Sequence, residues 1–425
     1  MACISSQDIV FLRSDRGFVR TARANEKKVA LGKTSFSLEG AIGKPYGTTF
    51  EIDRSRLVPT VNESSSSTLL EGFESGIDNK DIYDDGQAQR LNRDEITALK
   101  QEGASAKEIV EQLMENSSTF KERTEYSQAK YIKRKLIRHR PRVTIVRPST
   151  RLVCEMCWTR SPSKSLYMRV DTLAQMLTIA NVHSGCNVML VESCQGLLTG
   201  AVLERLGGCG RLIQITHNEI VVRPALDALH LSDDVRKVLM DIQLKELDKF
   251  GGKLEAGVTV DVIKGSNETC EEHCIEGVRD EKAREVDDQE ILGRKRRKLT
   301  FEEKAAKRKA RTEHIETVNR ILMEQKMDSL IVASKYHPWP IVSSLLDYIA
   351  PSRQIVIYSQ HQEPLVECYS NLRSTGCVVN WKLSDTWFRH YQVLPQRTHP
   401  MVNMSATGGY ILSATTVASS QACSV

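Results

Sequence analysis

The sequence predicts an α/β protein with a small all-β domain in its N-terminal part. The main observation is a β-α alternation after Asp171, in which apolar runs such as 188–191 and 330–333 alternate with helical patterns such as 197–206. This rhythm is typical of a mostly parallel, doubly wound sheet. The second observation is a series of short β-like runs over 9–52 with glycines beside them, which is typical of a small barrel or curled sheet.

Three segments follow from these patterns. We expect a β domain over 1–77, a helical connector over 78–150 and the α/β domain over 151–425. A disordered insertion is expected at about 265–311, because it is first acid-rich, then base-rich, and has almost no apolar residues; near its end it should become a charged helix. The elements expected in the α/β domain are strand 188–191, helix 197–206, strand 212–215, strand 330–333, helix 341–349, strand 355–358, helix 364–373, strand 378–383 and strand 410–412.

Local signals define the helices of the connector. Asn92 with Glu95 three residues later is a capping box, and Ser105 with Glu108 is a second one. A third helix should start near residue 119 and end before Pro141, which cannot continue a helix.

Composition excludes several classes of protein. The 425 residues hold 59 Lys+Arg and 54 Asp+Glu, and the resulting net charge of +5 is too small to argue nucleic-acid binding by itself. No apolar stretch approaches the ~18 residues of a membrane span, so no membrane partner is expected. The first nine residues lack the pattern of a secretory signal, and 11 thinly spread cysteines favour a reducing compartment over a disulfide scaffold.

The first strand-to-helix turn of the α/β domain, at 191–200, is a candidate cofactor turn. Nucleotide and S-adenosylmethionine sites carry closely spaced glycines there, because a backbone without Cβ lets the cofactor approach. Here Ser193, Cys194 and Gln195 occupy the expected glycine positions. The acid that would hold a ribose after the next strand is also missing, since Glu219 comes too late. The sequence therefore favours a turn without a cofactor.

Two other sites are minority interpretations. Cys194 resembles the nucleophile of a cysteine hydrolase, with His217 or His337 as base, but the large Glu192 violates the small-residue pattern of a nucleophile elbow. A zinc site at Cys154 and Cys157 is disfavoured, because a strand over 153–158 would place the two on opposite faces. A second Cys pair, 270 and 274, falls in the insertion.

A basic run is the strongest functional signal from the residues themselves. Nine Lys/Arg and no Asp or Glu occur over 130–151. Lys130, Arg134 and Arg138 are spaced four apart, hence on one helical face at steps of roughly 6 Å. A solvated face is the usual alternative, but ordinary surfaces mix the signs of charge, so phosphate contact is favoured. A second basic run at 294–298, followed by 307–309, reads as a nuclear-import signal or another phosphate-contacting helix.

Longer strings of the chain carry a family resemblance. The sequence resembles the non-catalytic subunits of eukaryotic tRNA (adenine-58-N1) methyltransferases, through 78–86, 108–135, 147–151, 171–175, 192–200, 364–369, 387–395 and 408–410. This resemblance implies a Rossmann-like methyltransferase fold with a degenerate cofactor site and no catalytic residues. It also implies tRNA and a catalytic sister subunit as partners, in a two-plus-two heterotetramer in the nucleus. This chain would have no cofactor of its own, and S-adenosylmethionine would bind to the sister, which makes 1-methyladenosine in the T-loop.

The resemblance also assigns tRNA contacts residue by residue. Within 79–89, Asp81, Asp84 and Asp85 disfavour phosphate, so backbone or ribose contacts are expected there. The candidate tRNA-binding residues are Asn79, Lys80, Gly86, Gln87, Gln89, Lys130, Tyr131, Lys133, Arg134, Lys135, Arg138, His139, Arg160, Lys164, Lys307, Lys335, Arg373 and Asn380. The alternatives are an active S-adenosylmethionine-dependent RNA methyltransferase and a tRNA-binding scaffold with a wider role in translation.

Overall fold

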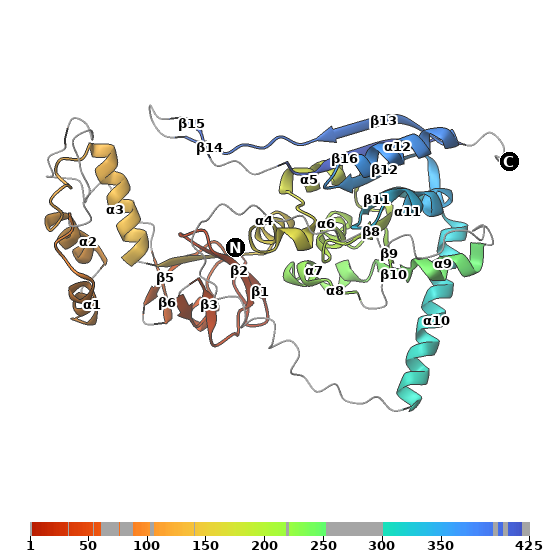
Figure 1. Ribbon diagram of the computed structural model, residues 1–425. Helices are drawn as coiled ribbons and strands as arrows, with labels where there is room; N and C mark the ends of the chain where they lie inside the picture. The colour runs from red at the N-terminus through yellow and green to blue at the C-terminus, as the bar shows by residue number, and fades with distance from the viewer. Residues whose placement is uncertain are drawn as a thin grey trace. The chain divides into compact units, whose positions relative to one another are not determined.

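A computed structural model gives the fold of the chain (Figure 1). It describes residues 2–32, 34–53, 55–60, 76, 88–102, 106–139, 141–217, 221–251, 301–393, 398–402 and 407–418. The chain divides into two compact units, 1–160 with 224–230 and 161–223 with 231–425. None of the helices in the described residues has both the length and the apolar character needed to cross a membrane.

The first unit is built on a five-stranded antiparallel sheet with the order β2-β1-β7-β5-β6. Its large apolar side chains, including Phe36 and Phe50, are buried and form one core. The strands are β1 (Ile9–Ser14), β2 (Val19–Arg23), β5 (Thr49–Asp53), β6 (Arg56–Pro59) and β7 (Arg142–Val146), with a separate hairpin of β3 (Val29–Leu31) and β4 (Thr34–Phe36).

The position of β7 differs from the sequence prediction. Residues 142–146 were expected in the helical connector of 78–150, but they form the central strand of the β domain. The helical segment is therefore inserted between β6 and β7, and the β domain extends beyond residue 77. No local pattern could predict this pairing, because β7 pairs with β1 across about 130 residues.

Three helices occupy this insertion: α1 (Arg93–Glu102), α2 (Ala106–Glu115) and α3 (Glu125–His139). The first capping box is confirmed, since the Asn92 side chain accepts from the Glu95 amide at 2.9 Å and the Asn92 amide donates to the Glu95 carboxylate at 2.9 Å. Ser105, of the second expected box, lies outside the described residues. A small apolar cluster of Val110, Met114, Phe120 and Ile132 joins α2 to α3.

The second unit holds the seven-stranded sheet β10-β9-β8-β11-β12-β16-β13. The first five strands are parallel, and β16 runs antiparallel to both of its neighbours, so the predicted mostly parallel sheet is confirmed. Its strands are β8 (Asn187–Glu192), β9 (Arg211–Thr216), β10 (Leu239–Gln243), β11 (Met327–Ala333), β12 (Ile349–Ser359), β13 (Val378–Asp385) and β16 (Tyr410–Thr416), with a short pair of β14 (Tyr391–Gln392) and β15 (His399–Pro400).

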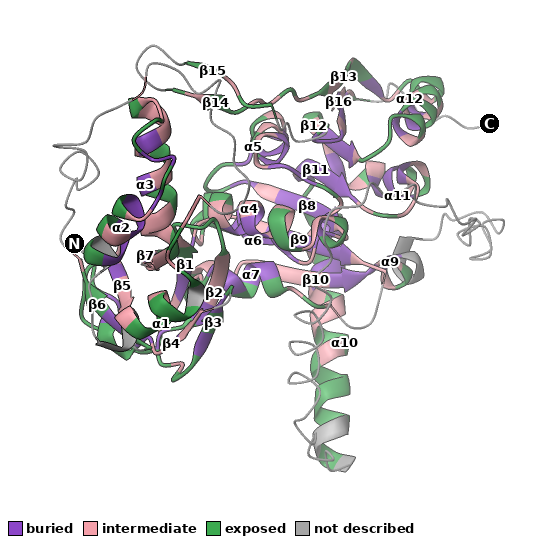
Figure 2. Cartoon of the chain, turned by 60° about the vertical axis from the view of Figure 1, so that its left-hand side comes forward, coloured by how far each residue is buried: buried purple, intermediate pink, exposed green. Residues whose placement is uncertain are grey.

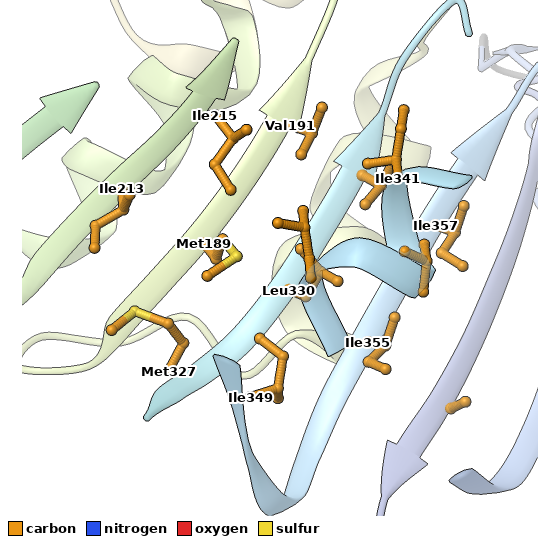
Figure 3. Packing of buried hydrophobic residues seen from close by; sticks show 14 of the residues in the cluster. Met189, Val191, Ile213, Ile215, Met327, Leu330, Ile341, Ile349, Ile355 and Ile357 are labelled. Atoms are coloured by element: carbon orange, nitrogen blue, oxygen red, sulfur yellow. The ribbon is translucent and has the colours of Figure 1, made fainter. Parts of the chain in front are cut away.

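Helices lie between these strands in the order that a doubly wound sheet requires. They are α5 (Val170–Ile179), α6 (Leu197–Leu206), α8 (Asp233–Arg236), α9 (Leu244–Gly251), α10 (Phe301–Glu324), α11 (Pro338–Leu345) and α12 (Glu363–Thr375), while α4 (Thr150–Arg160) and α7 (Pro224–Ala228) belong to the first unit. Figure 3 shows side chains such as Met189, Ile213, Leu330 and Ile357 packing on the sheet, and Figure 2 shows the purple buried positions concentrated in its strands.

Two local predictions were wrong, and one strand was not predicted. Residues 153–158 form part of helix α4 and not a strand. Val153, Cys154 and Met156 of this helix are buried, so its apolar residues pack against the rest of the unit. The expected helix 341–349 ends at Leu345, and Ile349 already begins β12. Strand β10 was missed. Of the expected insertion, residues 301–311 are helical within α10, as expected for its end, whereas 265–300 lie outside the described residues.

A buried ion pair fixes the segment that follows β13. The Arg169 guanidinium, with a side chain only 6% exposed, donates to both carboxylate oxygens of Asp171 at 2.6 and 2.7 Å and to the Thr386 carbonyl at 2.8 Å. Burial of Asp171 opposes its ionisation, but hydrogen bonds from Arg169 and Thr386 and the Arg169 charge outweigh it, and the pKa of Asp171 is lowered. The Thr172 hydroxyl donates to the Gly408 carbonyl at 2.9 Å, so both ends of 386–408 are tied to α5.

Candidate functional site

The turn between β8 and α6 lies at the carboxyl edge of the parallel strands, where α/β proteins bind ligands. Gln195 and Gly196 adopt positive φ angles of 59° and 82°. A Cβ at Gly196 would lie 2.7 Å from the Cβ of Arg223. This glycine therefore makes room for the chain's own arginine, rather than for a ligand.

The side-chain carboxylate of Glu192 caps the N-terminal end of α6. It accepts from the Leu198 amide at 3.1 Å, from the Thr199 amide at 3.0 Å and from the Thr199 hydroxyl. Burial raises the pKa of Glu192, although these hydrogen bonds and the Arg223 charge act in the opposite direction. A phosphate- or cofactor-binding turn leaves such amides free for its ligand. Here the amides of the first helical turn already have an internal partner.

A cavity of about 290 Å³ remains beside this turn. Its lining includes Ser193, Gln195, His217, Lys335 and Tyr336, from the ends of β8, β9 and β11. The rings of His217 and Tyr336 are 4.6 Å apart, and the Lys335 ammonium lies 5.2 Å from the centre of the Tyr336 ring. Burial, and to a lesser extent the Lys335 charge, lowers the pKa of His217, so its imidazole is neutral near pH 7.

The hydrolase interpretation finds no support in this geometry. Cys194 is fully buried, and its Sγ lies 3.8 Å from the Ala333 carbonyl. His337 serves as the N-cap of α11, where its Nδ1 accepts from the Trp339 amide at 3.4 Å. A nucleophile elbow would instead present the sulfur to solvent.

The argument against a zinc site at Cys154 and Cys157 assumed a strand, and that assumption was wrong. Because 150–160 is a helix, Cys154 and Cys157 share a face after all. Nevertheless, the described residues contain no group of three or more His, Cys, Asp or Glu side chains that could hold a metal ion. Cys270 and Cys274 lie outside the described residues.

Helix α3 carries the basic run on its surface. The side chains of Lys130, Lys133, Arg134 and Arg138 are exposed, whereas Ile132 is buried against α2. The spacing inferred from the sequence therefore does give a solvent-facing row of charges. Because Lys133 flanks this row and 130–138 contains no acid, the row presents positive charge of the kind that contacts phosphates.

Two half-buried residues support the basic row. The Tyr131 hydroxyl donates to the Gln89 side chain at 3.0 Å, and the Lys135 ammonium lies 5.1 Å from the centre of the Tyr131 ring. Burial, followed by the charges of Arg138, Arg134 and Arg123, lowers the pKa of Lys135. His139 is half-buried at the end of α3. The hydrogen bond between Tyr131 and Gln89 thus ties α3 to the segment before α1.

Sequence reasoning missed the residue that fixes the end of this helix. The Arg16 guanidinium donates to the carbonyls of Arg138 at 2.8 Å and Ile137 at 3.3 Å, in the last turn of α3. A cation at this end also interacts favourably with the negative end of the helix dipole. Arg16 lies in the β1–β2 turn and has no distinctive sequence context, so only the fold reveals this link between the β domain and α3.

The remaining candidates lie on separate elements. Arg160 ends α4 in the first unit and is exposed. The second unit presents Lys164, Lys307 on α10, Lys335 at the cavity and Arg373 in the last turn of α12, all of them exposed. Asn380 is exposed at an irregularity of β13, with φ 56°. Asn79, Lys80, Gly86 and Gln87 lie outside the described residues.

Comparisons with known proteins agree with the resemblance seen in the sequence. The model of the Gcd10p family matches residues 3–287. The chain is 38% identical to the tRNA (adenine(58)-N(1))-methyltransferase non-catalytic subunit TRM6 of Mus musculus, over 98% of this chain and 89% of that protein. It is 27% identical to the subunit of the same name from Dictyostelium discoideum, over 92% and 74% of the two chains.

Among solved structures, a SAM-dependent O-methyltransferase of Thermotoga maritima is similar with a TM-score of 0.51 and 9% identity, over 98% of this chain and 96% of that one. At this identity the likeness concerns the fold alone, and it agrees with the predicted Rossmann-like methyltransferase architecture.

Proposed function

The chain belongs to the Gcd10p family, and from this premise we propose that it is the tRNA-binding, non-catalytic subunit of a tRNA (adenine-58-N1) methyltransferase. The observation that carries the tRNA-binding part is the exposed basic row of α3, with Lys130, Arg134 and Arg138 on one face. Phosphate contact is the natural use of a row of cations without intervening acids. The candidate residues outside α3, such as Arg373 and Asn380, would add contacts from the second unit.

The catalytic step belongs to a sister subunit in this proposal. The Glu192 carboxylate already accepts hydrogen bonds from the amides of α6, and Arg223 packs against Gly196. His217 follows β9, at the position where a ribose-binding acid would be expected. These residues do not suit S-adenosylmethionine, so the sister would bind the cofactor and transfer the methyl group to the T-loop adenosine.

The isolated chain is expected not to bind S-adenosylmethionine. Titration calorimetry of the full chain should give no heat of binding, whereas the chain co-expressed with its sister should bind the cofactor through the sister. Micromolar affinity in the isolated chain would contradict the non-catalytic role and favour an active methyltransferase.

We further propose a two-plus-two heterotetramer and a nuclear location. A surface suited to the sister is the arm formed by 387–393 and 398–402, which contains β14 and β15. Its apolar side chains are far more exposed than is usual, with Trp387 at 70%, Val393 at 75% and Val402 at 88%. Exposed apolar groups of this size, gathered in one short segment, are typical of protein interfaces. The basic run 294–298, which motivates import into the nucleus, lies outside the described residues.

Replacing the apolar side chains of this arm should disrupt assembly. The triple variant Trp387→Ser, Val393→Ser and Val402→Ser removes apolar area that the sister could bury. Each Å² of buried apolar area that is lost weakens the binding free energy by about 25 cal/mol. Native mass spectrometry of the co-expressed subunits should then show free chains instead of the assembly. Met323→Ser, which changes a 69% exposed side chain on α10, is the control and should leave assembly intact. An intact assembly in the triple variant would remove the arm from the interface.

A further inference from the structure

The cavity at the carboxyl edge of β8, β9 and β11 contains polar groups that the fold itself does not use. Among the described residues, the Ser193 hydroxyl, the Gln195 amide and the Lys335 ammonium take part in no side-chain hydrogen bond or ion pair. The Nε2 atom of His217 is buried and has no hydrogen-bond partner. Because this atom is shielded from solvent, the polar groups that remain open to a ligand are those of Ser193, Gln195 and Lys335.

One cation of the cavity remains available to a ligand. Its described lining contains two charged side chains, Glu192 and Lys335. The Glu192 carboxylate is already engaged by α6, with the Arg223 charge nearby. The exposed ammonium of Lys335 is therefore the charge that remains available to a ligand, and it favours an anion.

The walls of the cavity favour a flat ring. His217 and Tyr336 lie against each other at 4.6 Å, and Val222, which is 67% exposed, lines the cavity as well. Aromatic side chains of this kind stack on nucleobases without strong preference for one base. A volume of about 290 Å³ is at the small end of ligand pockets, which suits one nucleotide better than a larger cofactor.

We propose that this cavity binds one nucleoside 5′-monophosphate unit, either free or as an unpaired nucleotide of an RNA strand. The base packs against His217 and Tyr336, and the phosphate pairs with Lys335. Ser193 and Gln195 offer further hydrogen bonds to phosphate or ribose. Where its occupant is an RNA nucleotide, this site rests on the proposed function, because Lys335 is already a candidate tRNA-binding residue; it adds a pocket that the surface of α3 does not provide.

The test uses the full chain and uridine 5′-monophosphate, with uridine as the probe that lacks phosphate, in titration calorimetry. Tyr336→Leu keeps an apolar side chain but removes the ring, and should weaken both probes about tenfold. Lys335→Gln should weaken the monophosphate and leave uridine unchanged. Arg205→Gln removes an exposed charge at the opposite end of α6 and is the matched control, expected to bind as the wild type does.

Competition with tRNA then identifies the source of the nucleotide. Displacement of the monophosphate by saturating tRNA supports a nucleotide within RNA, and its absence supports a free mononucleotide; either result is consistent with the site. No binding at millimolar monophosphate, or equal binding in Tyr336→Leu and wild type, overturns the proposal. The proposal is also overturned if S-adenosylmethionine binds more tightly than the monophosphate and Tyr336→Leu and Lys335→Gln abolish that binding. If α3 variants lose tRNA binding but still bind the monophosphate, the result bears on the tRNA-binding role of α3 and not on the cavity. The two proposals can therefore fail separately.

Discussion

Reversing three charges on α3, by Lys130→Glu, Arg134→Glu and Arg138→Glu, is expected to lower the affinity of the assembled complex for tRNA by about 100-fold. The estimate takes about 1 kcal/mol for each exposed contact that is lost. The slope of log K against log salt should also become shallower, by roughly 0.7–0.9 for each phosphate contact removed. Filter binding across a range of salt concentrations measures both effects.

The control for this triple variant reverses three other exposed cations of the second unit, Arg205, Arg320 and Lys382. It changes the net charge equally and should have a much smaller effect on tRNA binding. Assembly with the sister should survive in both variants, because exposed basic side chains contribute little to an apolar interface. Unaltered tRNA binding in the α3 variant would make the basic run a plain solvated surface, and loss of assembly would place α3 in the subunit interface.

Removal of the buried guanidinium by Arg169→Met is expected to destabilise the second unit by about 3–5 kcal/mol. The cost is large because the substitution leaves the Asp171 carboxylate buried in part without its partner and deprives the Thr386 carbonyl of its donor. Urea unfolding at pH 7 measures the change. Arg205→Met, at an exposed arginine, should stay within about 0.5 kcal/mol of wild type.

The pH dependence of the same pair has a definite sign. The pKa of Asp171 is lowered in the folded protein, so its contribution to stability is fully present above the ordinary value of 3.8. The contribution is lost as the pH falls through the folded pKa. In Arg169→Met, burial without the partner guanidinium raises the pKa of Asp171 instead, so the difference between wild type and variant should be largest near pH 7 and narrow as the pH falls and the variant's carboxyl takes up its proton. A difference below 1 kcal/mol at pH 7 would show that the pair is not essential to this unit.

The sequence was most informative where both ends of an element carried local signals. Helix α6 was predicted with its observed bounds, because Gly196 and Gly207 mark its two ends with positive φ. The buried strands β8, β9 and β11 were recognised for a similar reason, since each is a short apolar run.

Prediction failed where tertiary contacts decide the structure. The apolar run 153–158 has no clear period, and packing made it helical. Strand β10 contains Asp241 and Gln243 among its five residues, so its burial depends on β9 beside it and not on its own composition. In the candidate sites, the spacing of α3 predicted its exposed charges, but Arg16 and the His217–Tyr336 pair come together only in the fold.

Because β7 is the central strand of its sheet and the last of that sheet's strands in the sequence, the β domain cannot be completed early in translation. The ribosome must add the residues from Thr60 to Val146 after β6 has emerged, which takes about 4–17 s at the usual rate of synthesis. During this time the facing edges of β1 and β5 have no strand between them, and unpaired edges are sites of aggregation. Nascent chains of this protein thus carry two unpaired strand edges until β7 arrives, and a product terminated before Arg142 would retain both.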